Sequence, residues 1–134
     1  MTFDLGVWHS DRALDDAAAA AVYLAICEGT PIAGDGALSS SPRVAAFMAA
    51  LAERYPDLDS IPEEAVDDSP WSSGFEYSDS HSIFNIRWSR AESMLAEISA
   101  LATEHSLVLY DPQEGRVHNP PHLSRRPQWR FWRR

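Results

Sequence analysis

The spacing of apolar residues changes along this chain, and this change restricts the fold more than any other feature. Phe3 to Trp8 alternates buried-type and other side chains, as a strand with one better-buried face does. Residues 10–29, 41–55 and 89–105 instead repeat apolar residues at intervals of three and four, which predicts amphipathic helices. The chain therefore mixes both types of element from its first thirty residues onward.

The remaining strands are expected in the second half of the chain. Residues 75–88 predict a hairpin that turns at Asp79-Ser80, residues 107–110 a further strand, and residues 116–118 a short last strand. The predicted order is β-α-α-β-β-α-β with a short terminal strand. Without one helix, this is the β-α-β-β-α-β order of ferredoxin-like domains.

Single apolar stripes on the helices favour a two-layer sandwich, in which the helices cover one face of a mainly antiparallel sheet. We therefore expect an α+β fold, a ferredoxin-like variant with one extra helix. The chain length suits one domain, residues 1–122, followed by an arginine- and tryptophan-rich tail, residues 123–134. The acidic, proline-broken residues 57–73 must cross the domain if the strands are to run in the standard directions.

Short-range signals predict where the helices begin and end. The expected N-caps are Ser10 or Asp11 for the first helix, Ser41 before Pro42 for the second, and Ser89 for the third. Gly29 is expected to end the first helix. Ser89 and Glu92 have the spacing of a capping box, in which each side chain accepts from the other residue's amide.

Charge is distributed unevenly between the body and the tail. Residues 1–124 hold six arginines and twenty carboxylates, a formal charge of −14, whereas the last ten residues, RRPQWRFWRR, hold five arginines and no acid. An acidic body repels nucleic acid and anionic membranes, so we expect no nucleic-acid binding by the folded part. It attracts a basic protein, although acidity that serves solubility alone is the alternative explanation.

Five tryptophans are more than a core of this size requires. Trp is enriched at interface hot spots because it buries a large area and carries one donor at its edge. The predicted partner-binding residues are Trp71, Asp67, Asp68, Trp8 and Trp88. Packing at the rim of the core is the alternative explanation for the three indoles.

Catalytic motifs do not emerge from the sequence, and no catalytic, cofactor-binding or metal-binding residue is assigned. His118, His122 and Asp111 form the one set that a small hydrolase or metal enzyme could use. Asp111 also begins the segment Asp-Pro-Gln-Glu-Gly, in which an Asp side chain accepts an amide two residues on. The turn interpretation of Asp111 is the preferred one.

A single cysteine, Cys27, can form no internal disulfide, and its position near the end of a helix disfavours a reactive thiolate. The N-terminus lacks the basic residues of a secretion signal, and no apolar run reaches the ~20 residues of a membrane span. These features predict a cytoplasmic protein without a membrane span.

Three segments, DDSPW, IRWSRAE and LVLYDPQEGRVHNPP, carry a resemblance to other proteins. They resemble small uncharacterised proteins of the actinobacterial type, which share a WSRAE helix start and an LVLYDPQ turn. The resemblance covers most of residues 3–121 and excludes the tail. It implies a similar strand–helix–strand order and a boundary before the tail, and no activity.

The sequence thus favours a non-enzymatic module that binds a basic protein, with an inhibitor or immunity-type protein as one form of it. A small hydrolase or metal-dependent enzyme that uses His118, His122 and Asp111 is the alternative. A homo-oligomer in which the tail docks on a neighbouring copy is a third hypothesis.

Overall fold

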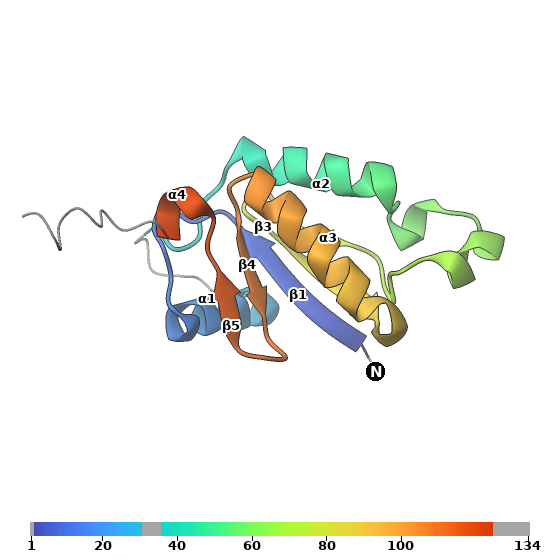
Figure 1. Ribbon diagram of the computed structural model, residues 1–134. Helices are drawn as coiled ribbons and strands as arrows, with labels where there is room; N and C mark the ends of the chain where they lie inside the picture. Colours follow the sequence, from blue (N-terminus) through green and yellow to red (C-terminus); the bar gives the residue numbers. More distant parts are fainter. Residues whose placement is uncertain (1, 31–35, 125–134) are drawn as a thin grey trace, which may run out of the picture.

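Strand β1 (Thr2–Trp8) runs through the centre of a five-stranded antiparallel sheet in the computed structural model, which describes residues 2–30 and 36–124 (Figure 1). The other elements are α1 (Asp16–Glu28), α2 (Pro42–Arg54), η1 (Leu58–Ser60), η2 (Glu63–Asp68), β2 (Glu76–Tyr77), β3 (His81–Arg87), η3 (Trp88–Arg90), α3 (Ala91–Glu104), β4 (Val108–Asp111), β5 (Arg116–His118) and α4 (Pro121–Ser124). The η elements are short 3-10 helices. The predicted α+β class and its order of main elements are confirmed.

The sheet has the strand order β2-β3-β1-β4-β5. β1 pairs with β3 along its whole length, from Thr2 opposite Arg87 to Trp8 opposite His81. On its other side, the last three residues of β1 pair with β4. The two edge strands are only two and three residues long. Short edges leave few unpaired backbone groups for another chain to pair with.

The helices cover both faces of the sheet, so the arrangement differs from the expected two-layer sandwich. Leu5, Val7 and Leu109 belong to one core cluster, together with residues of α2 and α3. Trp8 and Tyr110 belong to a second cluster, which α1 covers. Neighbouring residues of a strand point to opposite faces, and Figure 1 shows α2 above the sheet and α1 below it.

A glycine in the central strand allows α1 to lie close to the second face. A Cβ atom added to Gly6 would lie 2.8 Å from Cδ1 of Tyr23, a residue of α1. The Tyr23 ring also packs against the Tyr110 ring, with their centroids 5.4 Å apart. The missing side chain at Gly6 therefore makes room for the aromatic contact that holds α1 on the sheet.

The helix ends confirm some of the predicted caps and correct others. Ser41 caps α2 and accepts from the Arg43 amide, and Gly29 ends α1 in the left-handed conformation. The cap of α1 is Asp15, which accepts from the Ala18 amide at 2.7 Å, so the prediction of Ser10 or Asp11 is wrong. Ser10 is buried and donates instead to the Arg12 carbonyl at 2.6 Å.

The capping box predicted at Ser89 and Glu92 is also wrong. The chain makes a turn of 3-10 helix over Trp88–Arg90, so α3 begins later, at Ala91. Its N-cap position is Arg90, which makes no capping hydrogen bond through its side chain. At the start of α3, a turn of 3-10 helix therefore takes the place of the predicted capping box. Such turns are common at helix ends.

The chain between α2 and β2 crosses the domain over residues 71–77, later than predicted, because the acidic residues 57–68 lie at one end of the domain and Trp71 is bound back to Tyr55. Trp71 forms a bridge to Ile86 near the end of β3, and six residues later Tyr77 pairs with Ser82 near its start. The chain thus runs back along most of β3 before the hairpin. In the described part of the chain, none of the helices is both long enough and apolar enough to cross a membrane.

Candidate functional site

Trp71 and Trp8, two of the predicted partner-binding residues, lie in the interior. Both side chains are 0% exposed. Trp71 stacks on Phe84 with ring centroids 5.5 Å apart, and its Nε1 donates to the Tyr55 carbonyl at 3.0 Å. The prediction that these two indoles contact a partner is therefore wrong, because they fill the two core clusters instead.

Trp88 is the exception, since 54% of its surface is exposed. Its ring meets Phe3 edge to face, with centroids 5.8 Å apart. This contact supports one side of the indole and leaves the rest open. Trp88 is thus an aromatic side chain held in place at the surface, immediately after β3.

Arg87 and Arg90, which lie close to Trp88 in the sequence, bind the backbone around Asp67 and Asp68. Arg87 donates from its guanidinium to the Val66 carbonyl at 2.9 Å and from its amide to the Pro70 carbonyl at 2.8 Å. Arg90 donates to the Asp68 carbonyl at 3.5 Å. Both guanidinium groups therefore bind backbone oxygens. We call Trp88, Asp67 and Asp68 the Trp88 surface.

The residues that lead to this surface, 57–68, form an acidic segment at one end of the domain, drawn in green in Figure 1. Its exposed carboxylates are those of Asp59, Glu63, Glu64, Asp67 and Asp68. Within residues 2–30 and 36–124, the ion pairs are His9–Asp11 and Arg54–Glu97, and neither involves this segment. Unneutralised carboxylates gathered on one segment create a negative potential that attracts cations.

The acidic segment is fixed to the body by its own backbone contacts. Asp57 accepts from the Phe75 amide at 3.1 Å and from the Asp59 amide at 3.2 Å. Asp59 lies so close to Gly74 that a Cβ atom there would meet its carboxylate. The exposed carboxylates therefore project from a segment whose two ends are attached to the core.

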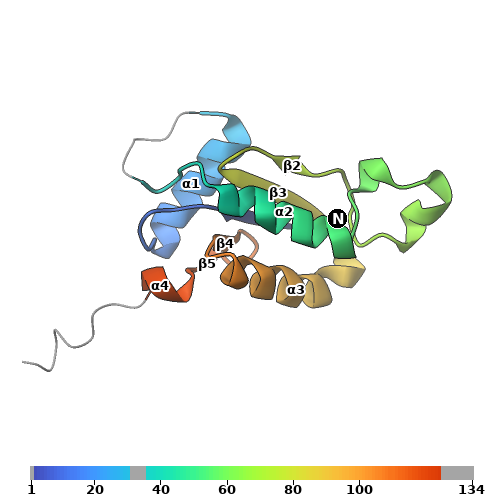
Figure 2. The same ribbon diagram turned by 90° about the horizontal axis from the view of Figure 1, so that it is seen from above.

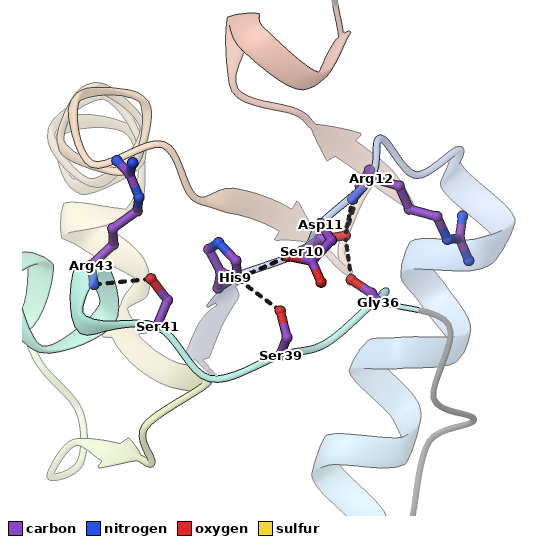
Figure 3. Close-up of polar contacts among 8 residues, drawn as sticks. All are labelled: His9, Ser10, Asp11, Arg12, Gly36, Ser39, Ser41 and Arg43. Carbon is purple, nitrogen blue, oxygen red and sulfur yellow. Dashed lines mark hydrogen bonds and ion pairs between the residues drawn. The ribbon is translucent and has the colours of Figure 1, made fainter.

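A second polar cluster lies at the end of β1, where no sequence pattern predicts one (Figure 3). His9 Nδ1 lies 2.8 Å from Ser39 Oγ and 3.9 Å from Asp11 Oδ1. In a catalytic triad, the serine and the carboxylate contact opposite nitrogens of the ring. Here both approach Nδ1, so Asp11 cannot orient the imidazole toward Ser39.

The contacts around this cluster connect two loops. The Ser39 amide donates to the His9 carbonyl at 3.0 Å, and the Asp11 amide donates to the Gly36 carbonyl at 2.7 Å. Ser10, also drawn in Figure 3, adds a contact to the Gly36 carbonyl at 3.2 Å. These bonds attach the loop after β1 to the loop before α2, which is a structural role.

Asp111 is a turn residue, as its sequence context predicts. It is 4% exposed, and its Oδ1 accepts from the Gln113 amide at 2.9 Å and from the Gln113 side chain at 2.6 Å. His118 and His122 are exposed on β5 and α4. Among the residues that the structure describes, no three His, Cys, Asp or Glu side chains are grouped so that they could hold a metal ion. The set of Asp111, His118 and His122 is therefore not assembled into a metal site.

Burial shifts the titration of three side chains. It raises the pKa of Tyr23 above the ordinary range, and it raises the pKa of the Cys27 thiol although a hydrogen bond with Tyr23 acts in the opposite direction. Burial also lowers the pKa of His81, against the attraction of Glu76 and Asp79. A raised thiol pKa reduces the thiolate fraction, so Cys27 is a poor nucleophile.

An apolar groove of about 480 Å³ separates α2 from the chain around β2. Its lining includes Ala45, Met48, Ala49, Ala52, Phe75 and Tyr77. We call it the α2–β2 groove. Seen from above, β2 lies beside α2 on the side away from α3 (Figure 2).

Comparison with protein-family models, with curated proteins and with solved structures finds no match to this chain.

Proposed function

We propose that this chain is a non-enzymatic module that binds a basic protein through the Trp88 surface and the adjoining acidic segment. One observation carries the proposal: the Trp88 indole is 54% exposed, and Arg87 and Arg90, close to it in the chain, bind the backbone of an acidic segment whose exposed carboxylates belong to none of the ion pairs of the described residues. An inhibitor or immunity-type protein directed at a basic toxin is one form that such a module takes.

The chemistry of the Trp88 surface suits arginine and lysine. A cation placed over an indole face gains roughly 0.5–2 kcal/mol, with more when water is excluded. The exposed carboxylates of the acidic segment raise the rate of encounter with a basic surface and disfavour acidic competitors. Trp88 and the acidic segment therefore supply a hydrophobic anchor and exposed carboxylates.

Preorganisation supports the same proposal. The Phe3 contact holds the Trp88 ring, and Asp57 and Arg87 hold the two ends of the acidic segment. A surface that is already ordered loses less conformational entropy when a partner binds, and this preserves affinity. The catalytic alternative has no such support, because Asp111 is occupied in its turn.

Two further proposals concern the class of the protein. We infer a ferredoxin-like relationship from the order β2-β3-β1-β4 and from the position of α2 and α3 on one face, with α1 and β5 as additions. We also place the protein in the cytoplasm, where an unpaired thiol such as Cys27 stays reduced.

Affinity capture followed by calorimetry tests the function. Partners captured from a bacterial host by the wild-type protein are purified, and Kd is measured for Asp67→Asn/Asp68→Asn. A control variant, Glu53→Gln/Glu104→Gln, removes two exposed carboxylates elsewhere. The proposal expects a partner with a high isoelectric point, a Kd raised about tenfold or more in the test variant at low salt, and an unchanged Kd in the control. Equal Kd values for all three proteins would refute it.

A further inference from the structure

The α2–β2 groove and the C-terminal tail have complementary chemistry. The groove is lined by apolar and aromatic side chains, and Tyr77 at its edge is 61% exposed. Two carboxylates adjoin it: Asp57 in the lining and Asp59, which lies beside Gly74. The tail, RRPQWRFWRR, supplies three aromatic residues and five arginines without an acid.

We infer that the α2–β2 groove of one copy binds residues 125–134 of a second copy. The aromatic residues Trp129, Phe131 and Trp132 supply the apolar part of the contact, and the arginines face the carboxylates around the groove. A volume of about 480 Å³ accommodates more than one aromatic side chain. This contact is separate from the Trp88 surface and does not depend on the proposed function.

The length of chain after α4 indicates that the tail comes from another copy. α4 follows β5, and β5 and β2 are the opposite edges of the sheet. Four strand spacings of about 4.8 Å separate these edges by about 19 Å before the chain has passed around any helix. Trp132, the last aromatic residue of the tail, is the eighth residue after Ser124, so a fully extended backbone between them spans at most about 29 Å, and it must also pass around α2 and α3, each about 10 Å across.

The geometry also determines the type of assembly. The groove and the start of the tail lie at different edges of the same sheet, so the contact joins two different surfaces. Such a contact is heterologous, and it continues from copy to copy unless the rotation closes a ring. The expected association is head to tail, and it increases with protein concentration.

Light scattering on the full-length chain tests this inference. The wild-type mass is expected to rise above that of one chain between about 1 µM and several hundred µM, a range typical of weak association. Ala49→Arg places a cation in the groove, and Trp129→Ala/Trp132→Ala removes two aromatic anchors from the tail. Each variant is expected to stay monomeric. Ala46→Arg is the matched control, because Ala46 is also exposed on α2 and does not line the groove.

Mixing the two monomeric variants tests directly whether the tail of one copy binds the groove of another. Ala49→Arg keeps an intact tail, and Trp129→Ala/Trp132→Ala keeps an open groove, so together they are expected to form a heterodimer and nothing larger. A synthetic peptide of residues 125–134, added in excess, is expected to dissociate the wild-type assembly. Circular dichroism confirms that each variant is folded. A monomeric wild type, association that survives both variants, or a mixture that stays monomeric would overturn the inference.

Discussion

The indole Nε1 of Trp71 donates to the backbone carbonyl of Tyr55 at 3.0 Å, and this bond closes the chain between the two residues into a loop. Tyr55 ends α2, and Trp71 forms the bridge to β3. The acidic segment lies between them. A buried tryptophan therefore positions the carboxylates that the proposed function uses, although it offers no surface to the partner.

Substitution of Trp71 is expected to destabilise the protein strongly. Trp71→Ala removes a fully buried indole that stacks on Phe84. A substitution of this kind typically lowers the free energy of unfolding by about 3–5 kcal/mol. Trp71→Phe keeps most of the volume but leaves the Tyr55 carbonyl without this donor, at a cost of about 1–3 kcal/mol. Urea unfolding followed by circular dichroism measures both. A loss below 1 kcal/mol for Trp71→Ala would contradict the interior placement.

Gly6→Ala tests the position of α1 on the second face of the sheet. The added methyl group meets the Tyr23 ring, so we expect about 1–3 kcal/mol of destabilisation by overpacking. In the background of Tyr23→Leu, which shortens that side chain, the cost of Gly6→Ala is expected to shrink. A double-mutant cycle by thermal unfolding gives the coupling, and strict additivity of the two changes would argue against the contact.

Asp111→Ala is expected to weaken the turn after β4. The substitution removes the acceptor of hydrogen bonds from the Gln113 amide, the Gln113 side chain and the Glu114 amide. Charged acceptors of this kind contribute about 1.5–3 kcal/mol. Asp111→Asn retains one side-chain oxygen and should lose less. Chemical unfolding compares the two variants, and equal stability of wild type and Asp111→Ala would refute the turn role.

His81 is expected to make stability fall as the pH is lowered. Burial lowers its pKa in the folded state below the ordinary value of about 6.5, so the unfolded chain binds the proton more readily. The stability contribution is therefore present above about pH 6.5 and is lost as the pH falls through the folded-state pKa. Unfolding free energies of wild type and His81→Gln between pH 7 and pH 5 measure it. A wild-type slope that His81→Gln leaves unchanged would exclude His81 as the cause.

Features encoded by neighbouring residues were predictable from the sequence. The alternation in Phe3–Trp8 predicts β1, and Ser41-Pro42 predicts the start of α2, because both signals act within a few residues. The order of the main elements follows from such signals. The Asp111 turn belongs to the same group, since its amide partners lie two and three residues away.

Features that depend on distant residues were not predictable. The carbonyl that binds Trp71 lies 16 residues away, and the hydroxyl beside His9 lies 30 residues away. The covering of the second face of the sheet by α1 was not predictable from the sequence. It depends on Trp8 and Tyr110, far apart in the chain, being buried together on the side opposite to Leu5 and Leu109. Of the predicted surface, Trp88, Asp67 and Asp68 are exposed, and no local pattern indicates the contacts by which Arg87 and Arg90 bind the backbone of the acidic segment.

The central claim is that Trp88 anchors a basic protein partner, and the affinity of Trp88→Ala tests it most directly. Calorimetry with the captured partner compares this variant with Trp8→Phe, which alters an interior indole of the second core cluster instead. The account predicts that Trp88→Ala raises Kd about tenfold or more with little change in unfolding free energy, as for hot-spot tryptophans. It predicts the wild-type Kd for Trp8→Phe under conditions where that variant is folded. Wild-type affinity in Trp88→Ala would contradict the account.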